Sequence, residues 1–423
     1  MYKFQVKNFP NGLRLLMVPS KESLSFQITT LVNTGADFET KNLNGISHFL
    51  EHMCFKGTKK RPTNLDIAKE LDRVGGIYNA FTGREYTGYF VRVAKEYQQL
   101  AIDIVSDIYL NSQFPEAEIE KERGVIIEEI NMYHDDPKSY IDELWIKLLY
   151  GNQPAGWSIA GTKTNIHQIS RRDFLTYHQQ QYRSQSTLII VSGNFKTREV
   201  TNLIQQAFVS IPRGKAKNKI KAKEKQKQPQ LIFEKRNIDQ THIILGVRGI
   251  NIFDQRRYAL NVFDSILSGG MSSRLFQLVR GKLGAAYYID SGIEAKTDTG
   301  YWAVISGLDS KRVELILKEI LAEWQSFKKI PVSSQEMTKA KEFMMGQMAL
   351  AFEDVHKIAS FYGTQLLLKK KIENYQEYLR KIKQVTSRDV QKLANDLLKP
   401  ECLNLAMVGP HSTAKQFKKI LHI

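Results

Sequence analysis

His48 and His52 lie four residues apart, and Glu51 stands directly before the second of them. On a helix this spacing places both imidazoles on one face about one turn apart, with Glu51 on nearly the same face. Two neutral imidazoles so placed can hold one metal ion, and the adjacent carboxylate can act as a base. With nine histidines in 423 residues, the pattern H-x-x-E-H arises by chance with a probability of about two in a hundred or less, so ordinary helix histidines stay an alternative.

A zinc ion with an open catalytic position needs a third protein ligand from elsewhere in the chain. The segment after Pro115 is predicted as a strong helix with six glutamates, most of which are expected to face solvent. Glu129 is the best third ligand, because its neighbours three and four positions away are all apolar or aromatic and a carboxylate in such surroundings needs a partner. Glu122, seven residues earlier on the same face, is expected to orient a histidine or the ligand itself.

The elements that must position these residues form two similar halves. Thr87-Gly88-Tyr89 recurs as Thr299-Gly300-Tyr301, at an offset of 212 residues, within strand-like surroundings. Alternating runs predict strands at 24–32, 86–93 and 188–191, and again at 242–247, 287–294 and 301–305. Amphipathic helices lie between them, and the strands mostly neighbour other strands. We therefore predict an α+β fold of two homologous domains, each a mainly antiparallel sheet flanked by helices.

Only the first half can build the metal site. The same offset places Leu260 opposite His48, Phe263 opposite Glu51 and Asp264 opposite His52. The second copy therefore lacks both imidazoles and the base.

The boundary between the halves is predicted at a lysine-rich segment, residues 213–230, which separates residues 1–212 from 231–423. This segment holds eight lysines and arginines against one acid, Glu224, and contributes much of the net charge of +17. Such a stretch is usually a solvated linker or an exposed edge, although a patch for nucleic acid or an anionic surface is the alternative.

The two cysteines, Cys54 and Cys402, follow no disulfide or metal-site spacing. A cytoplasmic location is expected, because no signal peptide or membrane-spanning run is present; a cleaved organellar transit peptide stays an alternative.

Four segments together resemble one family. They are HFLEHMCFKGT from His48, YNAFTGREYTGYFVRV from Tyr78, ERGVIIEEINMYHDDP from Glu122 and GGMSSRLFQLVRGKLGAAYYIDSG from Gly269. Their order and spacing are similar to those of the pitrilysin, or inverzincin, zinc peptidases (M16). The resemblance covers nearly the whole chain and is strongest to the short-chain branch that includes mitochondrial processing peptidase and its bacterial relatives.

The resemblance assigns roles to particular residues. It implies that His48, His52 and Glu129 bind one zinc ion per chain, that Glu51 is the general base and that Glu122 supports the site. It implies that Asn79, Ala80 and Phe81 form a sheet edge to which an extended substrate adds as a strand. It also implies that Arg280 and Tyr287 stabilise the oxyanion of the substrate, although Leu283 departs from the basic residue that relatives often carry nearby.

The predicted function is therefore a zinc endopeptidase that cleaves extended, unfolded or short peptides inside a closed chamber. The family builds that chamber from four domains, so a homodimer of this chain is expected, with a heteromeric partner of the same family as the alternative. Two other functions compete: a partner or scaffold subunit with little activity of its own, and a basic protein that binds nucleic acid or an anionic surface. No specific nucleic acid or membrane is expected as a partner.

Overall fold

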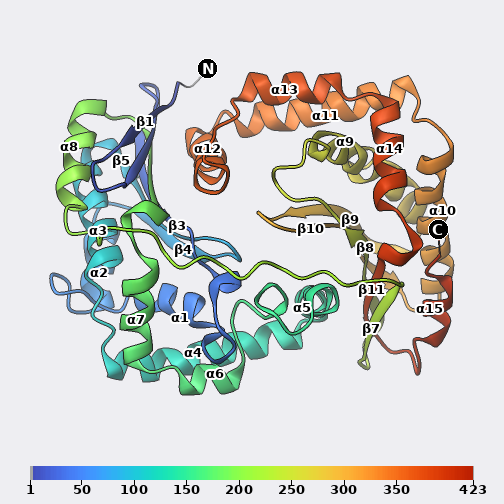
Figure 1. Ribbon diagram of the computed structural model, residues 1–423, viewed down its shortest axis with the longest axis horizontal. Coiled ribbons are helices and arrows are strands. Elements are labelled where there is room, and N and C mark those ends of the chain that lie inside the picture. The colour runs from blue at the N-terminus through green and yellow to red at the C-terminus, as the bar shows by residue number, and fades with distance from the viewer. Residues whose placement is uncertain (1–2, 423) are drawn as a thin grey trace. The chain divides into compact units, whose positions relative to one another are not determined.

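The computed structural model describes residues 3–422. In it the segments of alternating apolar and polar residues form two sheets. The strands of the first sheet are β1 (Gln5–Asn8), β2 (Arg14–Pro19), β3 (Ser25–Val32), β4 (Ile77–Thr82), β5 (Thr87–Ala94) and β6 (Thr187–Gly193). Those of the second sheet are β7 (Gln230–Lys235), β8 (Gln240–Arg248), β9 (Ala286–Ala295), β10 (Gly300–Asp309) and β11 (Leu403–Gly409). Every strand predicted from alternation is thus present. Figure 1 shows the strands as arrows and labels most of them.

Helices fill the intervals between the strands. In the first half they are α1 (Ile46–Met53), α2 (Asn64–Asp72), α3 (Gln98–Leu110), α4 (Glu116–Asp135), α5 (Pro137–Tyr150), α6 (Lys163–Gln168), α7 (Arg171–Gln181) and α8 (Thr197–Ala207). In the second half they are α9 (Arg257–Ser268), α10 (Val313–Lys329), α11 (Ser334–Ala351), α12 (Val355–Lys369), α13 (Tyr375–Gln384), α14 (Ser387–Leu397) and α15 (Lys415–Ile420), with a π-helical segment at Phe276–Lys282. No helix of the described residues is long and apolar enough to cross a membrane.

Five strands of the first sheet have the same order as the five of the second, which is the structural trace of the duplication, and β1 is an additional edge strand of the first sheet. The first has the strand order β1-β2-β6-β3-β5-β4 and the second β7-β11-β8-β10-β9. β2 runs parallel to β6 as β7 does to β11, and every other pair is antiparallel. The α+β fold with two mainly antiparallel sheets flanked by helices is therefore confirmed.

The chain divides into two units whose membership is not a simple cut. One unit holds the residues up to 132, 157–220 and 351–372, and the other holds 133–156, 221–350 and the residues from 373. The lysine-rich segment lies between the two sheets along the sequence, and the units divide within it, between residues 220 and 221. However, α5 packs on the second sheet although it precedes the segment, and α12 packs on the first sheet although it follows. Amphipathic periodicity could not reveal this, because it indicates which face of a helix is apolar and not which sheet covers it.

Each sheet is covered on both faces. In the first unit, one face packs against α1, α3, α4, α7 and α8, and α12 covers the other. Gly363 lets α12 approach closely, since a Cβ there would lie 2.1 Å from Ile190 Cδ1. His356 ties the same helix to the sheet, because its ring nitrogens pair with the hydroxyls of Ser25 at 3.0 Å and Ser192 at 2.8 Å.

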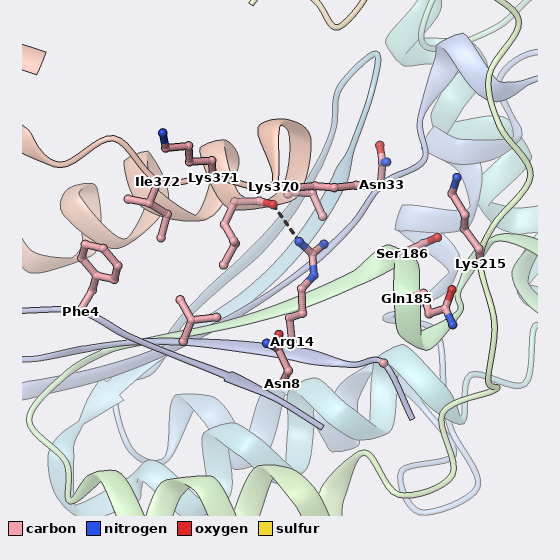
Figure 2. Close-up of a pocket in the computed structure, with 14 residues that line it drawn as sticks. Phe4, Asn8, Arg14, Asn33, Gln185, Ser186, Lys215, Lys370, Lys371 and Ile372 are labelled. Atoms are coloured by element: carbon pink, nitrogen blue, oxygen red, sulfur yellow. Dashed lines mark hydrogen bonds between the residues drawn. The ribbon is translucent and has the colours of Figure 1, made fainter. Parts of the chain in front are cut away.

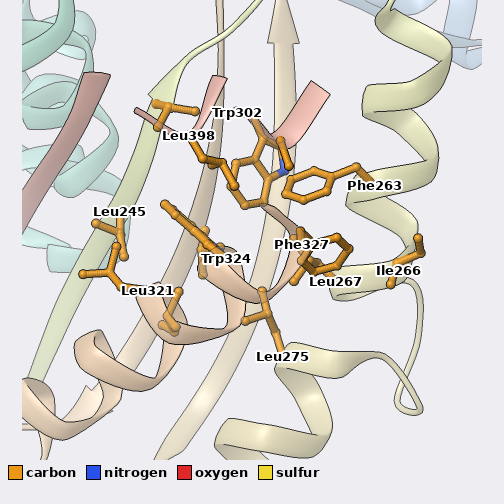
Figure 3. Packing of buried hydrophobic residues seen from close by; sticks show 14 of the residues in the cluster. Leu245, Phe263, Ile266, Leu267, Leu275, Trp302, Leu321, Trp324, Phe327 and Leu398 are labelled. Carbon is orange, nitrogen blue, oxygen red and sulfur yellow. The ribbon is translucent and has the colours of Figure 1, made fainter. Parts of the chain in front are cut away.

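The core of the second unit is built on aromatic contacts between α9, α10 and β10 (Figure 3). The ring centroids of Trp302 and Trp324 are 4.8 Å apart, and those of Phe263 and Trp302 are 4.9 Å apart. Such rings each bury a large apolar area, so this cluster holds the two helices on the sheet. α5 packs on the opposite face.

One lysine of the predicted linker is not solvated. The segment 213–229 contains no helix or strand, but Lys219 pairs with the buried carboxylate of Glu85 at 2.5 Å and lies 3.8 Å from that of Asp37. The general expectation of a solvated charge run is thus wrong at Lys219. Two buried carboxylates need compensating cations, and this lysine supplies one of them, with Arg84 at 3.6 Å from Asp37 as another.

Candidate metal centre

α1 carries the two histidines, and a buried acid fixes its start. The preceding Gly45 has a φ of 100°, and a Cβ there would lie 2.8 Å from the carbonyl oxygen of Ala160. The Glu39 carboxylate accepts hydrogen bonds from the backbone N–H groups of Gly45 and Ser47, each at 2.8 Å. A negative charge at this end is favoured by the helix dipole, so Glu39 does the work that the side chain of an N-cap residue usually does.

The opposite faces of α1 have different environments. Phe49, Leu50 and Met53 are buried in the core of the first unit, which leaves the face with His48, Glu51 and His52 partly open. The helix can therefore present both imidazoles without moving, because its position is set by apolar packing on the other side.

His48, His52 and Glu129 converge on one point, although α1 and α4 lie far apart in the sequence (Figure 1). The Nε2 atoms of His48 and His52 are 3.3 Å apart, and Glu129 Oε2 lies 3.6 Å from the first and 3.7 Å from the second. Ligands about 2.0–2.2 Å from a tetrahedral zinc ion stand about 3.3–3.6 Å from one another. The three ligand atoms are therefore spaced as zinc requires, and their N, N, O chemistry suits that ion.

Glu122 and Lys56 extend the site behind His52. Glu122 Oε1 accepts a hydrogen bond from His52 Nδ1 at 2.8 Å, and its other oxygen pairs with the Lys56 ammonium. Burial acts to raise the pKa of Glu122, but these hydrogen bonds and charges outweigh it and lower the pKa. An ionised Glu122 fixes the tautomer of His52 so that Nε2 faces the metal position.

The pKa values of the two histidines shift in opposite directions. Burial, aided by the charge of His52, lowers the pKa of His48 to about 4, so its imidazole is neutral near pH 7. Burial acts to lower the pKa of His52 as well, but the hydrogen bond with Glu122 and the surrounding carboxylates outweigh burial and raise it. A metal bound here must displace a proton from His52 at low pH, so affinity should fall on acidification.

Glu51 is a half-buried carboxylate with an unsatisfied, buried oxygen. Its Oε2 has no hydrogen-bond partner, and neither has Nδ1 of His48. Burial raises the pKa of Glu51, while a hydrogen bond from Thr82 and the charge of His52 work against that rise. A carboxylate with a raised pKa and a free oxygen is suited to take and return a proton. Buried polar atoms that only contribute to packing normally have a hydrogen-bond partner, so the unpaired oxygen of Glu51 indicates a functional role.

The predicted substrate strand lies at an edge. β4 pairs only with β5 and ends the first sheet, so one side of its backbone is unpaired within the described chain. Asn79, Ala80 and Phe81 all belong to it, and Phe81 is 40% exposed. An exposed edge of this kind can accept an added strand.

Arg280 and Tyr287 belong to the second unit. Arg280 lies in the π-helical segment, with its guanidinium carbon 5.0 Å from the centroid of the Phe276 ring. Tyr287 lies on the edge strand β9 and is 66% exposed. Both side chains are therefore open to a ligand.

The second unit has a cluster of hydrogen bonds at the position that corresponds to the candidate metal site of the first. Asp264 on α9, opposite His52 in the duplication, accepts hydrogen bonds from Trp302 Nε1 at 2.7 Å and Ser291 Oγ at 2.5 Å. These bonds tie α9 to the sheet, and Leu260 and Phe263 are buried in the core.

Sequence reasoning missed two residues and misjudged one environment. No spacing relative to the histidines marks Glu39 as part of the site. Lys56 lies four residues after His52, about one helical turn away, and this spacing could have predicted a charge beside that histidine. The apolar neighbours expected around Glu129 are partly open to solvent, because Val125 and Met132 are 52% and 57% exposed.

Comparison with known proteins defines the class of this chain. The sequence profile described as "Insulinase (Peptidase family M16)" matches residues 18–163, and "Peptidase M16 inactive domain" matches residues 168–344. The chain belongs to the M16 peptidase family, which confirms the resemblance read from its motifs.

Relatives match over almost the full length. An uncharacterized zinc protease of Bacillus subtilis is 33% identical, with 95% of this chain and 97% of the relative covered. One from Mycobacterium leprae is 32% identical, covering 98% and 93%. A protease from Helicobacter pylori has a similar fold, with a TM-score of 0.90, 21% identity and coverage of 97% of this chain and 100% of that one.

Proposed function

We propose that this protein is a zinc endopeptidase that hydrolyses extended peptides. The observation that carries the proposal is the mutual spacing of His48 Nε2, His52 Nε2 and Glu129 Oε2, which matches that of tetrahedral zinc ligands, next to the half-buried carboxylate of Glu51. Relatives in the same family are named zinc proteases, which agrees with this metal.

Each residue then has a chemical task. Zinc held by the three ligands would supply a Lewis acid that lowers the pKa of a bound water. Glu51 takes the proton of the attacking water and later gives it to the leaving amine, for which its raised pKa is suited. Glu122 holds the His52 ring in position, and Lys56 keeps Glu122 ionised. Arg280 and Tyr287 donate hydrogen bonds to the carbonyl oxygen as negative charge develops on it.

The substrate proposed is an extended peptide that pairs with β4. Backbone pairing with Asn79, Ala80 and Phe81 depends little on side chains, so the enzyme should accept many sequences. A folded protein has few free strands, so unfolded or short peptides are the substrates.

The assembly proposed is a homodimer with one zinc ion per chain. This chain carries both the metal residues and the Arg280–Tyr287 pair, so it need not borrow either from a different subunit, and two-fold self-association is the commonest oligomer. A Glu51→Gln chain mixed with a Tyr287→Phe chain should regain activity only if Tyr287 acts on the zinc site of the other chain. Sedimentation of an active monomer at assay concentration would refute the homodimer.

The decisive experiment separates metal binding from turnover. Glu51→Gln should keep full zinc, because all three ligands remain, while cleavage of a quenched peptide library falls by about 10²–10⁴. His52→Ala and Glu129→Ala should lose zinc itself. Glu128→Ala is the matched control, since Glu128 is an exposed glutamate that directly precedes Glu129 on α4. Full zinc in both ligand variants, or wild-type turnover in Glu51→Gln, would refute the proposal.

A further inference from the structure

The first unit contains a cavity that is lined by residues outside the candidate metal centre. It has a volume of about 650 Å³ and is formed by β1, β2, the turn at Gln185 and Ser186, and the end of α12 (Figure 2). Cavities that bind small molecules typically measure about 300–1,000 Å³. The volume is therefore that of a ligand site.

The charged side chains at this cavity all have the same sign. They are Arg14, Lys215, Lys370 and Lys371, and no aspartate or glutamate lines it. The lysines are exposed, but Arg14 is partly buried on β2. A concave wall of one sign concentrates its potential, so an anion would be attracted into it.

Arg14 is the centre of this charge. Figure 2 shows it extending from β2 toward the end of α12, with Phe4 and Ile372 on one side and Lys215 on the other. Its Nη1 donates to the carbonyl oxygen of Leu366 at 2.8 Å, and it makes no other hydrogen bond or ion pair in the described chain. A guanidinium has five N–H donors, so most of them are left for a ligand.

Another arginine of the same unit shows what a structural role looks like. Arg61 is buried and pairs with three carboxylates, those of Glu70, Asp103 and Asp107. Burial lowers the pKa of Arg14, and no carboxylate offsets that cost. A buried charge normally needs such a partner, so Arg14 has the geometry of a group that awaits an anion.

The negative end of α12 can balance only part of the positive charge at this cavity. The end of α12 carries the negative pole of the helix dipole, equivalent to about half an elementary charge. Arg14 satisfies one carbonyl there, and Lys370 is the C-cap residue. Four cations against half a charge leave a net positive surface.

The rest of the wall defines the body of the ligand. Phe4, Val6, Leu366, Leu367 and Ile372 supply apolar surface, and Asn8, Asn33 and Gln185 supply amides. We propose that this cavity binds a small organic anion in which one carboxylate or phosphate group pairs with Arg14 and an apolar body packs against Phe4 and the end of α12.

The test uses probes that separate the head group from the body. Decanoate and decyl phosphate are titrated into the full protein by calorimetry, with inorganic phosphate as a probe of the head group alone. Both decyl probes should bind, and inorganic phosphate should bind at least about tenfold more weakly, because it lacks the apolar body. A preference between the decyl probes distinguishes a carboxylate ligand from a phosphate ligand.

Two pairs of variants locate the binding. Arg14→Met should weaken both decyl probes by roughly 10- to 100-fold, the loss expected for a charge-assisted hydrogen bond, whereas Arg73→Met removes an exposed arginine outside the cavity and should change nothing. Should Arg14→Met fail to fold, Val6→Asp adds a negative charge on the exposed edge strand and should weaken binding likewise, with Leu24→Asp as its control. No binding by wild type, or equal binding by Val6→Asp and wild type, would overturn the proposal.

Discussion

Replacement of Glu122 by glutamine should weaken zinc binding without touching a zinc ligand. Glutamine has the same shape, but it removes the charge that His52 Nδ1 and Lys56 both contact. Glu122 is 6% exposed, so water cannot take its place. The neutral amide also no longer holds the His52 ring as firmly, since the hydrogen bond is then uncharged.

The magnitude follows from that hydrogen bond. A bond of 2.8 Å to a carboxylate is worth about 1.5–3 kcal/mol, which corresponds to roughly a 10- to 150-fold rise in the Kd for zinc. Measured losses for residues that support metal ligands, about 10- to 100-fold, fall in the same range. The Lys56 ammonium adds to the loss, because Glu122 is its only carboxylate partner in the described chain. Its unpaired charge would then repel the metal cation.

Competition with a chromophoric chelator measures the zinc Kd of wild type, Glu122→Gln, Lys56→Met and the double variant. The double variant should bind zinc more tightly than Glu122→Gln alone, since the unpaired ammonium is gone. Glu128→Gln, exposed on the same helix, should stay within about twofold of wild type. A Glu122→Gln protein that melts like wild type and binds zinc within twofold of it would refute the reasoning.

Two further predictions concern stability against pH, and their slopes have opposite signs. Burial raises the pKa of Glu39 from 4.5 to about 7, so the folded state binds more protons than the unfolded state in that interval and stability should fall by about 3 kcal/mol as pH rises through it. When the free energy of unfolding is measured with urea at several pH values, the Glu39→Gln variant should not show this fall. A wild-type free energy that is equally independent of pH would contradict the prediction. Burial, with the charge of Arg92, lowers the pKa of His356 from 6.5 to about 4, so the unfolded state binds more protons there. Stability should then drop by about 1–2 kcal/mol, after allowance for solvent screening, as pH falls from 6.5 to 4. His356→Gln should remove that drop, and an unchanged acid limb in this variant would exclude His356 as its cause.

Local pattern predicted most of the fold. Strand alternation and helix caps act within a few residues, so they are readable along the chain: the capping box of Thr63 and Asp66 that opens α2 is an example. The 212-residue repeat predicted two homologous domains, and five strands of the first sheet have the same order and pairing as the five of the second, with β1 as an addition. The histidine spacing predicted a shared helix face, because four residues make about one helical turn.

Contacts between distant segments could not be predicted in this way. The exchange of α5 and α12 between the units depends on which apolar surfaces meet, and no local pattern records that. The same holds for Glu39, which lies outside α1 and caps it through backbone groups, and for Lys219, whose burial follows from two acids more than a hundred residues away.

The sequence by itself determined which residues could serve as ligands and base: His48, Glu51 and His52 through helix geometry, and Glu129 through its place on a second helix. Only the tertiary structure decided that Glu129 Oε2 stands 3.6 Å from His48 Nε2 and that Glu122 reaches His52. Chain spacing fixes neighbours within one helix, whereas the distance between two helices is set by the packing of their buried faces, here a core that draws on residues from across the first unit.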